Sequence, residues 1–163
     1  IKVGDKIEIK PGRTTKKGLE TIKTEVNSLH SGVARDSLGP GGLVAIGTSL
    51  DPAMTKSDSL LGNVIGKPGT LPPVWNKFSV EATLLDRVVG TKNIQDMDEL
   101  KTKEPLMITV GTRTTVGIPI TVRKNIVDIN LTIPVCAPIG QRIALSRRVD
   151  GKWHLIGYGI IKE

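Results

Sequence analysis

Short runs rich in β-branched residues alternate with turn signals along this 163-residue chain. Val, Ile and Thr supply 49 residues, and such side chains fit the pleated, half-buried surface of a strand. The turn signals recur about every eight to twelve residues, a spacing typical of barrels and sandwiches of short strands. They are Gly4-Asp5, Pro11-Gly12, Gly39-Pro40-Gly41-Gly42, Asp51-Pro52, Pro68-Gly69, Gly117, Pro138-Ile139-Gly140 and Asp150-Gly151. The sequence therefore predicts an all-β fold.

Two segments show the alternation of a half-buried strand most clearly. Residues 6–10 alternate polar and apolar side chains. Residues 128–133 do the same, so Ile129, Leu131 and Ile133 are predicted to share one face. Residues 93–103 are predicted to form a charged loop, and no window of about twelve residues keeps the 3.6-residue period of a long helix.

The sharpest internal boundary is the proline-rich segment 67–73, which ends in Pro72-Pro73. Proline cannot donate to a sheet ladder and it stiffens the backbone, so this segment is predicted to connect two domains. The pieces on either side, residues 1–73 and 74–163, are small for independent domains. We therefore predict two small β-barrels packed on each other.

Basic residues exceed acidic ones, with 23 Lys and Arg against 16 Asp and Glu and a formal net charge of +7. Arg142, Arg147, Arg148 and Lys152 form a cluster. It either attracts nucleic acid through phosphate contacts or only solvates the surface, and charge alone favours neither. The four aromatic residues provide no extended base-stacking platform. The single Cys136 excludes a disulfide framework, and no apolar run reaches the roughly 18 residues of a membrane helix.

Common catalytic and metal-binding patterns are missing from the sequence. Residues 62–68 resemble a phosphate-binding loop, but three residues separate the glycines and a proline follows the lysine. The motif needs about four residues there, and a Ser or Thr after the lysine. Asp96, Asp98 and Glu99 have no neighbouring ligand residues and are predicted to be solvated. We therefore predict no catalytic residue and no metal site, which disfavours a small β-barrel enzyme.

Several segments resemble one family of translation factors. Residues 1–9 with Pro11-Gly12 resemble the second-domain barrel of translational GTPases such as elongation factor Tu. Other segments, taken in order, resemble the gamma subunit of archaeal and eukaryotic translation initiation factor two. These segments are residues 39–48, 50–58, 84–90 and 143–159, and the junction Leu71-Pro72-Pro73-Val74-Trp75 is similar to the archaeal form. The resemblance covers essentially the whole chain.

The resemblance implies two β-barrels of the domain-two and domain-three type, residues 1–73 being the second domain and 74–163 the third. The first strand of the second domain is expected to be missing. The family's GTPase domain, which holds GTP and Mg, is expected to be absent as well. The chain itself is therefore predicted to be no enzyme and to need no cofactor of its own.

The resemblance also implies partners. The family holds methionylated initiator tRNA and delivers it to the small ribosomal subunit. By motif position, Val26, Ser28 and His30 on one strand, and Leu43 and Gly47 on another, resemble the wall that receives the methionyl ester and terminal adenosine. Glycine permits close backbone approach, and an apolar wall suits a methionine side chain.

Loops of the family's second domain bind the alpha subunit, whereas the beta subunit binds through the absent GTPase domain. The matching loops supply Arg13, Lys16, Lys17, Asp51, Thr55 and Lys56. The resemblance implies a cytoplasmic protein without a membrane partner. The alternative is the same portion of another tRNA-carrying GTPase, such as the selenocysteine-specific elongation factor. Residues 84–87 and 144–148 favour the initiation factor.

Overall fold

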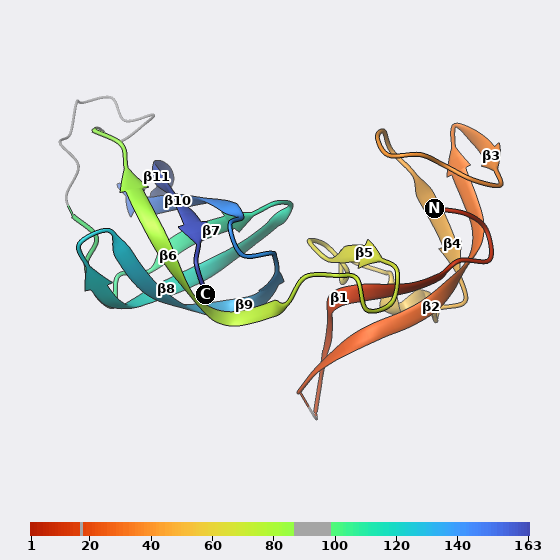
Figure 1. The fold of residues 1–163 in the computed structure, drawn as a ribbon, viewed down its shortest axis with the longest axis horizontal. Coiled ribbons are helices and arrows are strands. Elements are labelled where there is room, and N and C mark those ends of the chain that lie inside the picture. The colour runs from red at the N-terminus through yellow and green to blue at the C-terminus, as the bar shows by residue number, and fades with distance from the viewer. Residues whose placement is uncertain (17, 87–98) are drawn as a thin grey trace. The chain divides into compact units, whose positions relative to one another are not determined.

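The computed structural model describes residues 1–16, 18–86 and 99–163. Within these ranges the chain divides into two compact units, unit 1 (Ile1–Leu71) and unit 2 (Pro72–Glu163). The sequence interpretation draws its boundary two residues later, after Pro73. Apart from one short 3₁₀ helix, the regular structure of the described ranges consists of strands (Figure 1). The all-β prediction is confirmed.

Unit 1 is a curled sheet. Its elements are β1 (Lys6–Thr15), β2 (Gly18–Ser31), β3 (Val33–Arg35), β4 (Ala45–Thr48), the 3₁₀ helix η1 (Pro52–Met54) and β5 (Val64–Gly66). The strands run in the order β3-β2-β1-β5, and β4 pairs with β2. Strands β3, β4 and β5 have only three or four residues each. Within the described residues the sheet is open, since no pairing connects its first strand to its last.

The interior of unit 1 is small. Ile7 from β1 and Val26 and Leu29 from β2 are buried, and Leu38, Val44 and Ile46 pack against them. A buried carboxylate ties the first strand to the last turn of the unit. Glu8 is 4 % exposed, and its Oε1 accepts a hydrogen bond of 3.0 Å from the backbone N–H of Gly69. This hydrogen bond therefore supports the pairing of β5, near the end of unit 1, with β1 near its start.

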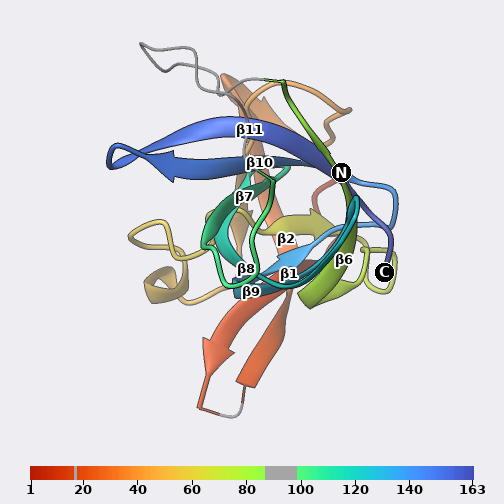
Figure 2. The ribbon, with the colours of Figure 1, turned by 90° about the vertical axis from the view of Figure 1, so that its left-hand side faces the viewer.

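Unit 2 is a closed antiparallel barrel (Figure 2). Its strands are β6 (Val74–Leu84), β7 (Leu106–Val110), β8 (Arg113–Arg123), β9 (Ile126–Cys136), β10 (Arg142–Val149) and β11 (Lys152–Ile161). They close in the order β10-β11-β6-β9-β8-β7. Phe78 and a set of aliphatic side chains fill the interior, including Val80, Leu106, Ile108, Val127, Ile129, Ile143, Leu145, Ile156 and Ile161. The core of this unit is much larger than that of unit 1.

Strand β9 departs from the alternation predicted for residues 128–133. Ile129 is buried in the barrel, whereas Ile133 is 40 % exposed. The ladder between β6 and β9 is irregular between residues 130 and 135 of β9. Val135, two residues further along β9, is again buried in the core that contains Ile129. Ile133 thus does not join Ile129 in the core.

The predicted charged loop at 93–103 lies mostly outside the described residues. Residues 99–103 are described and contain neither strand nor helix. Helical structure in the described part of the chain falls short of the length and apolarity needed to cross a membrane.

Candidate functional site

The end of β2 pairs with β4 and brings most residues of the predicted tRNA-binding wall into one ladder. Ser28 lies directly opposite Gly47, and His30 lies opposite Ala45. The ladder is irregular between Val26 and Ser28. Because of this irregularity, Ser28 and His30 lie on the opposite face of the sheet from the buried side chain of Val26. The two strands named by the sequence interpretation are thus neighbours.

Ser28 and Gly47 fit together only because position 47 has no side chain. A Cβ added at Gly47 would lie 2.3 Å from Ser28 Oγ and 3.5 Å from Ser28 Cβ. The serine hydroxyl therefore fills the space that any side chain at position 47 would need. It follows that Ser28 covers Gly47 on this side, and that the two residues form one closely packed pair of the wall.

The remaining residues of the predicted wall differ sharply in exposure. Val26 is 1 % exposed and packs with Ile7 and Leu29, so its side chain holds the sheet together and does not face a ligand. Leu43, immediately before the core residue Val44, is 91 % exposed. Leu43 has the highest exposed fraction among the large exposed hydrophobic side chains of the described residues.

A shallow hollow of about 270 Å³ lies beside the β2–β3 hairpin. Ser28 and His30 line it together with Asn27, Arg35 and Asp36, among others. Asn27 Nδ2 donates to Ser49 Oγ at 3.0 Å, which fixes that side of the hollow. The hollow therefore mixes polar side chains with apolar ones such as Val3 and Ala34, and Ser28 connects it to the Ser28–Gly47 pair.

The two loops predicted to bind the alpha subunit are in contact with each other. Arg13 Nη1, at the end of β1, lies 3.9 Å from the sulfur of Met54 in η1. The backbone N–H of Gly12 donates to Asn63 Oδ1 at 2.7 Å, and Asn63 Nδ2 donates to the carbonyl of Leu60 at 3.1 Å. The β1–β2 hairpin and the loop of residues 51–63 therefore form one surface, which we term the joined loops.

Glu20 orients Arg13 within the joined loops. The two residues face each other across the hairpin, and Glu20 Oε2 accepts from Arg13 Nε at 3.2 Å and from Nη2 at 3.0 Å. A Cβ at Gly12 would lie 2.0 Å from the carbonyl oxygen of Glu20, so the hairpin requires glycine there. These contacts leave Nη1 of Arg13 directed at Met54.

The loop of residues 51–63 is held in shape by its own short contacts. Asp51 Oδ1 accepts from the N–H of Ala53 at 2.9 Å, and Thr55 Oγ1 donates to the carbonyl of Pro52 at 3.2 Å. Lys16 and Lys56 are exposed, as are Asp51 and Thr55. The predicted contact Lys17 lies outside the described residues.

Comparison with known proteins assigns the chain to a family. The family model described as "Initiation factor eIF2 gamma, C terminal" matches residues 76–161. The chain belongs to this family.

Curated relatives extend the match over both units of this gamma-family chain. "Translation initiation factor 2 subunit gamma" of Methanothermobacter thermautotrophicus is 53 % identical over 167 residues, which cover 99 % of the chain and 41 % of the relative. The proteins of the same name from Methanocaldococcus jannaschii and Pyrococcus furiosus are 50 % and 48 % identical, again over 41 % of each relative. The chain thus spans about two-fifths of the length of these relatives, and the family resemblance inferred from its motifs is confirmed.

The basic cluster of this gamma-family chain is partly engaged within unit 2. Arg147 is held by Glu104, with Nη2 at 3.0 Å from Oε2 and a further hydrogen bond from Nε to Oε1. Its Nη2 also donates to the carbonyl of Glu99 at 2.9 Å. Arg147 therefore connects residues 99–104 to β10. Because its guanidinium is engaged in these contacts, Arg147 is removed from the residues of the basic cluster that could bind RNA.

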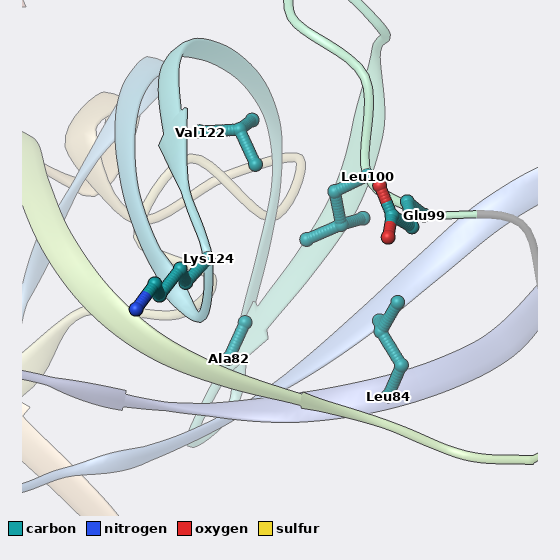
Figure 3. A pocket seen from close by; sticks show the side chains of 6 residues that line it. All are labelled: Ala82, Leu84, Glu99, Leu100, Val122 and Lys124. Atoms are coloured by element: carbon teal, nitrogen blue, oxygen red, sulfur yellow. The ribbon is translucent and has the colours of Figure 1, made fainter.

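A hollow of about 220 Å³ lies at one end of the barrel (Figure 3). Leu84 of β6, Leu100 and Val122 of β8 give it an aliphatic lining, and Glu99 and Lys124 stand on opposite sides of it. None of the predicted site residues lies here. Of the acidic trio 96, 98 and 99, Glu99 alone falls within the described residues.

Sequence reasoning missed Glu20 and Asn63. Glu20 had a signal, because a hairpin that pairs Thr15 with Gly18 places positions 13 and 20 opposite each other with opposite charges. Asn63 had none, since its partner Gly12 lies 51 residues away. In residues 1–16, 18–86 and 99–163, no three His, Cys, Asp or Glu side chains gather as a metal site would require.

Proposed function

We propose that this chain binds the alpha subunit and helps to hold methionylated initiator tRNA for delivery to the small ribosomal subunit. Its relatives are named gamma subunits of translation initiation factor 2. Two separate surfaces of unit 1 support the proposal. The joined loops are assigned to the alpha subunit, and the β2–β4 wall with Leu43 is assigned to the aminoacylated end of the tRNA.

The observation that carries the alpha-subunit assignment is the contact between two loops that are distant in sequence. Arg13 meets Met54 across 41 residues of chain, and Gly12 meets Asn63 across 51. Loops held together in advance lose little conformational freedom on binding, which favours affinity. The surface carries exposed charges of both signs, Arg13, Lys16 and Lys56 with Glu20, Asp51 and Asp58, and a partner with the complementary pattern of charges would pair with them.

The tRNA assignment is supported by the pairing of β2 with β4 at Ser28 and Gly47 and by the exposed side chain of Leu43. A methionine side chain needs an apolar contact, which Leu43 offers, and a terminal ribose or ester needs hydrogen-bonding groups, which Ser28 and His30 offer. Val26 serves this surface from inside the sheet. The chain acts here by binding and not by catalysis.

GTP, Mg and the beta subunit are assigned to other parts of the parent protein. We therefore expect GTP to leave the affinity of this chain for initiator tRNA unchanged. A gain in tRNA binding on addition of GTP to this chain would contradict the assignment.

Calorimetric titration with the C-terminal domain of an archaeal alpha subunit tests the joined loops. We expect a complex at protein concentrations on the order of tens of micromolar. Arg13→Glu reverses the charge at the contact between the loops and should weaken binding about tenfold. The matched control Arg123→Glu reverses an exposed charge of unit 2 and should leave binding unchanged. Absence of binding, or equal loss in both variants, would refute the assignment.

Fluorescence anisotropy with labelled methionylated initiator tRNA tests the wall. Leu43→Asp places a carboxylate beside the proposed methionine contact and should weaken binding several-fold, on the order of 1 kcal/mol. Leu61→Asp is the matched control, because Leu61 is also an exposed leucine of unit 1, at 64 %. If both changes weaken binding equally, Leu43 has no special place in tRNA recognition.

A further inference from the structure

The outer surface of the barrel carries two adjacent rows of uncharged side chains over β8, β7, β10 and β11. Directly opposed residues of antiparallel strands share a face. One row is Val116, Met107, Ser146 and Leu155, and the next is Thr114, Thr109, Ala144 and Tyr158. We term these eight residues the outer barrel face. Figure 2 shows β10 and β11 side by side, with β7 next to β10.

The outer barrel face is hollowed and apolar. A hollow of about 400 Å³ is lined by Thr109, Ala144, Leu155 and Tyr158, together with Arg142 at its edge and others. A second hollow of about 200 Å³ is lined by Met107, Val116 and Trp153 among others. Leu155 is 41 % exposed and Trp153 38 %. Exposed apolar side chains gathered beside hollows mark interaction sites on soluble proteins.

The aromatic residues of the chain support this interpretation. Phe78 is buried in the core, and Trp75 packs against it with its Nε1 donating to the carbonyl of Ala137 at 2.8 Å. Trp153 and Tyr158, by contrast, both lie beside the hollows of the outer barrel face. Tyrosine and tryptophan are the side chains that most often anchor protein partners.

Cations stand at both ends of the outer barrel face. Along β10 the outward positions are Arg142, Ala144, Ser146 and Arg148, so the two arginines are six residues apart, about 20 Å at the rise of a strand. Lys152 adds a third cation beside Arg148 at the start of β11. In the described part of the chain none of the three has a carboxylate within ion-pair distance. Asp150 in the intervening turn is the acidic residue nearest along the chain.

We propose that the outer barrel face binds a short extended segment of a protein partner, with apolar side chains in its middle and carboxylates at both ends. The two cationic ends are complementary to such carboxylates, and the hollow at Ala144 accepts an apolar side chain between them. RNA fits less well, because the guanidinium of Arg142 covers the Tyr158 ring at 4.5 Å from its centre and occupies a stacking surface. This surface lies in unit 2 and is separate from the surfaces proposed for alpha subunit and tRNA.

Binding of a synthetic peptide to the full chain tests the proposal. The probe has Leu, Phe and Leu at alternate positions between two pairs of glutamates, and its matched counterpart has lysines in place of the glutamates. Tryptophan fluorescence and calorimetry should detect binding of the acidic peptide and about tenfold weaker binding of the basic one. Leu155→Asp should weaken the acidic peptide about tenfold, whereas Ile139→Asp, at an exposed isoleucine outside the face, should not.

Reversal of the cations separates charge recognition from general stickiness. The triple change Arg142→Glu, Arg148→Glu and Lys152→Glu lies on exposed residues, reverses the charge at both ends of the outer barrel face and leaves the barrel core intact. It should invert the preference, so that the basic peptide binds more tightly than the acidic one. The proposal is overturned if the unaltered chain binds both peptides equally or binds neither. It is also overturned if single-stranded oligouridylate displaces the acidic peptide and binds less tightly to the Leu155→Asp variant.

Discussion

Units 1 and 2 are both built from antiparallel strands, but they differ in how the strands enclose a core. Unit 2 closes its six strands around a continuous core that includes Phe78 and Ile129. In the described part of unit 1 the sheet is open, and it covers a buried cluster of Ile7, Val26 and Leu29. Much of this unit consists of loops that are joined by side-chain contacts. The comparison indicates that the barrel supplies most of the stability, whereas unit 1 supplies surfaces formed by loops.

The two units can be followed separately because all four aromatic residues lie in unit 2. Intrinsic fluorescence therefore reports on the barrel alone. Amide hydrogen exchange of strands β1 and β2 reports on unit 1.

The largest effect is expected from the barrel core. Phe78→Ala removes a fully buried ring and should cost about 4 kcal/mol of unfolding free energy in unit 2. Leu29→Ala in unit 1 should cost about 2 kcal/mol, because a small open core relaxes around the lost side chain. Urea unfolding followed by fluorescence and hydrogen exchange measures the two values. A cost for Leu29→Ala equal to that for Phe78→Ala would remove the distinction between the units.

Ion pairs should show the same order at smaller magnitude. Arg147→Ala leaves Glu104 without its partner in a mostly buried place and should cost about 2 kcal/mol in unit 2. Arg13→Ala breaks the pair with Glu20, whose side chains are 50 % and 56 % exposed, and should cost less than about 1 kcal/mol. Equal losses in the two unfolding transitions would show that burial does not separate these pairs.

The Ser28–Gly47 pair should respond as a unit. Gly47→Ala brings the new Cβ onto Ser28 Oγ and should cost about 1–2 kcal/mol in unit 1. Adding Ser28→Ala removes the hydroxyl and leaves the two Cβ atoms at an ordinary contact distance, so the double variant should recover most of the loss. Hydrogen exchange of β2 and β4 measures the recovery, and a double variant as unstable as Gly47→Ala would contradict the steric account.

The smallest effect is expected from an exposed pair on the barrel. A hydrogen bond from Lys162 and its charge lower the pKa of Glu81, with a further contribution from Asn125. A lowered pKa in the folded state adds stability above the unfolded pKa, about 4.3, and this stability disappears as the pH falls through the folded value. Glu81→Gln should therefore lower the urea midpoint of the fluorescence transition slightly at neutral pH and not at pH 2. A difference that persists unchanged into acid would refute this linkage.

Local sequence signals were sufficient to predict the strands, but they did not predict whether each sheet closes into a barrel. Alternation in residues 6–10 and the turn at Asp150-Gly151 mark β1 and the β10–β11 hairpin because neighbouring residues determine them. Closure of the barrel and the exposure of Ile133 depend on how strands far apart in sequence pair with each other. Neither has a local signature.

The candidate site divides along the same line. Motif position named Ser28, Gly47 and Arg13, and the structure brings Ser28 against Gly47 and Arg13 against Met54. Burial of Val26 could not be predicted, because alternation alone does not reveal a ladder irregularity after that residue. The outer barrel face was missed for a similar reason. Its eight residues come from four strands and become neighbours only after the barrel closes.

The pairing of β1 with β5 has a consequence for the order of events during synthesis. Strand β1 forms its hairpin with β2 as soon as both leave the ribosome, but its other edge waits for residues 64–66. The carboxylate of Glu8 waits longer still, for a backbone N–H that follows 61 residues later. Unit 1 therefore completes its folding only when the segment beside the domain boundary emerges. A ribosome that pauses within the joined loops exposes the edge of β1 to neighbouring nascent chains.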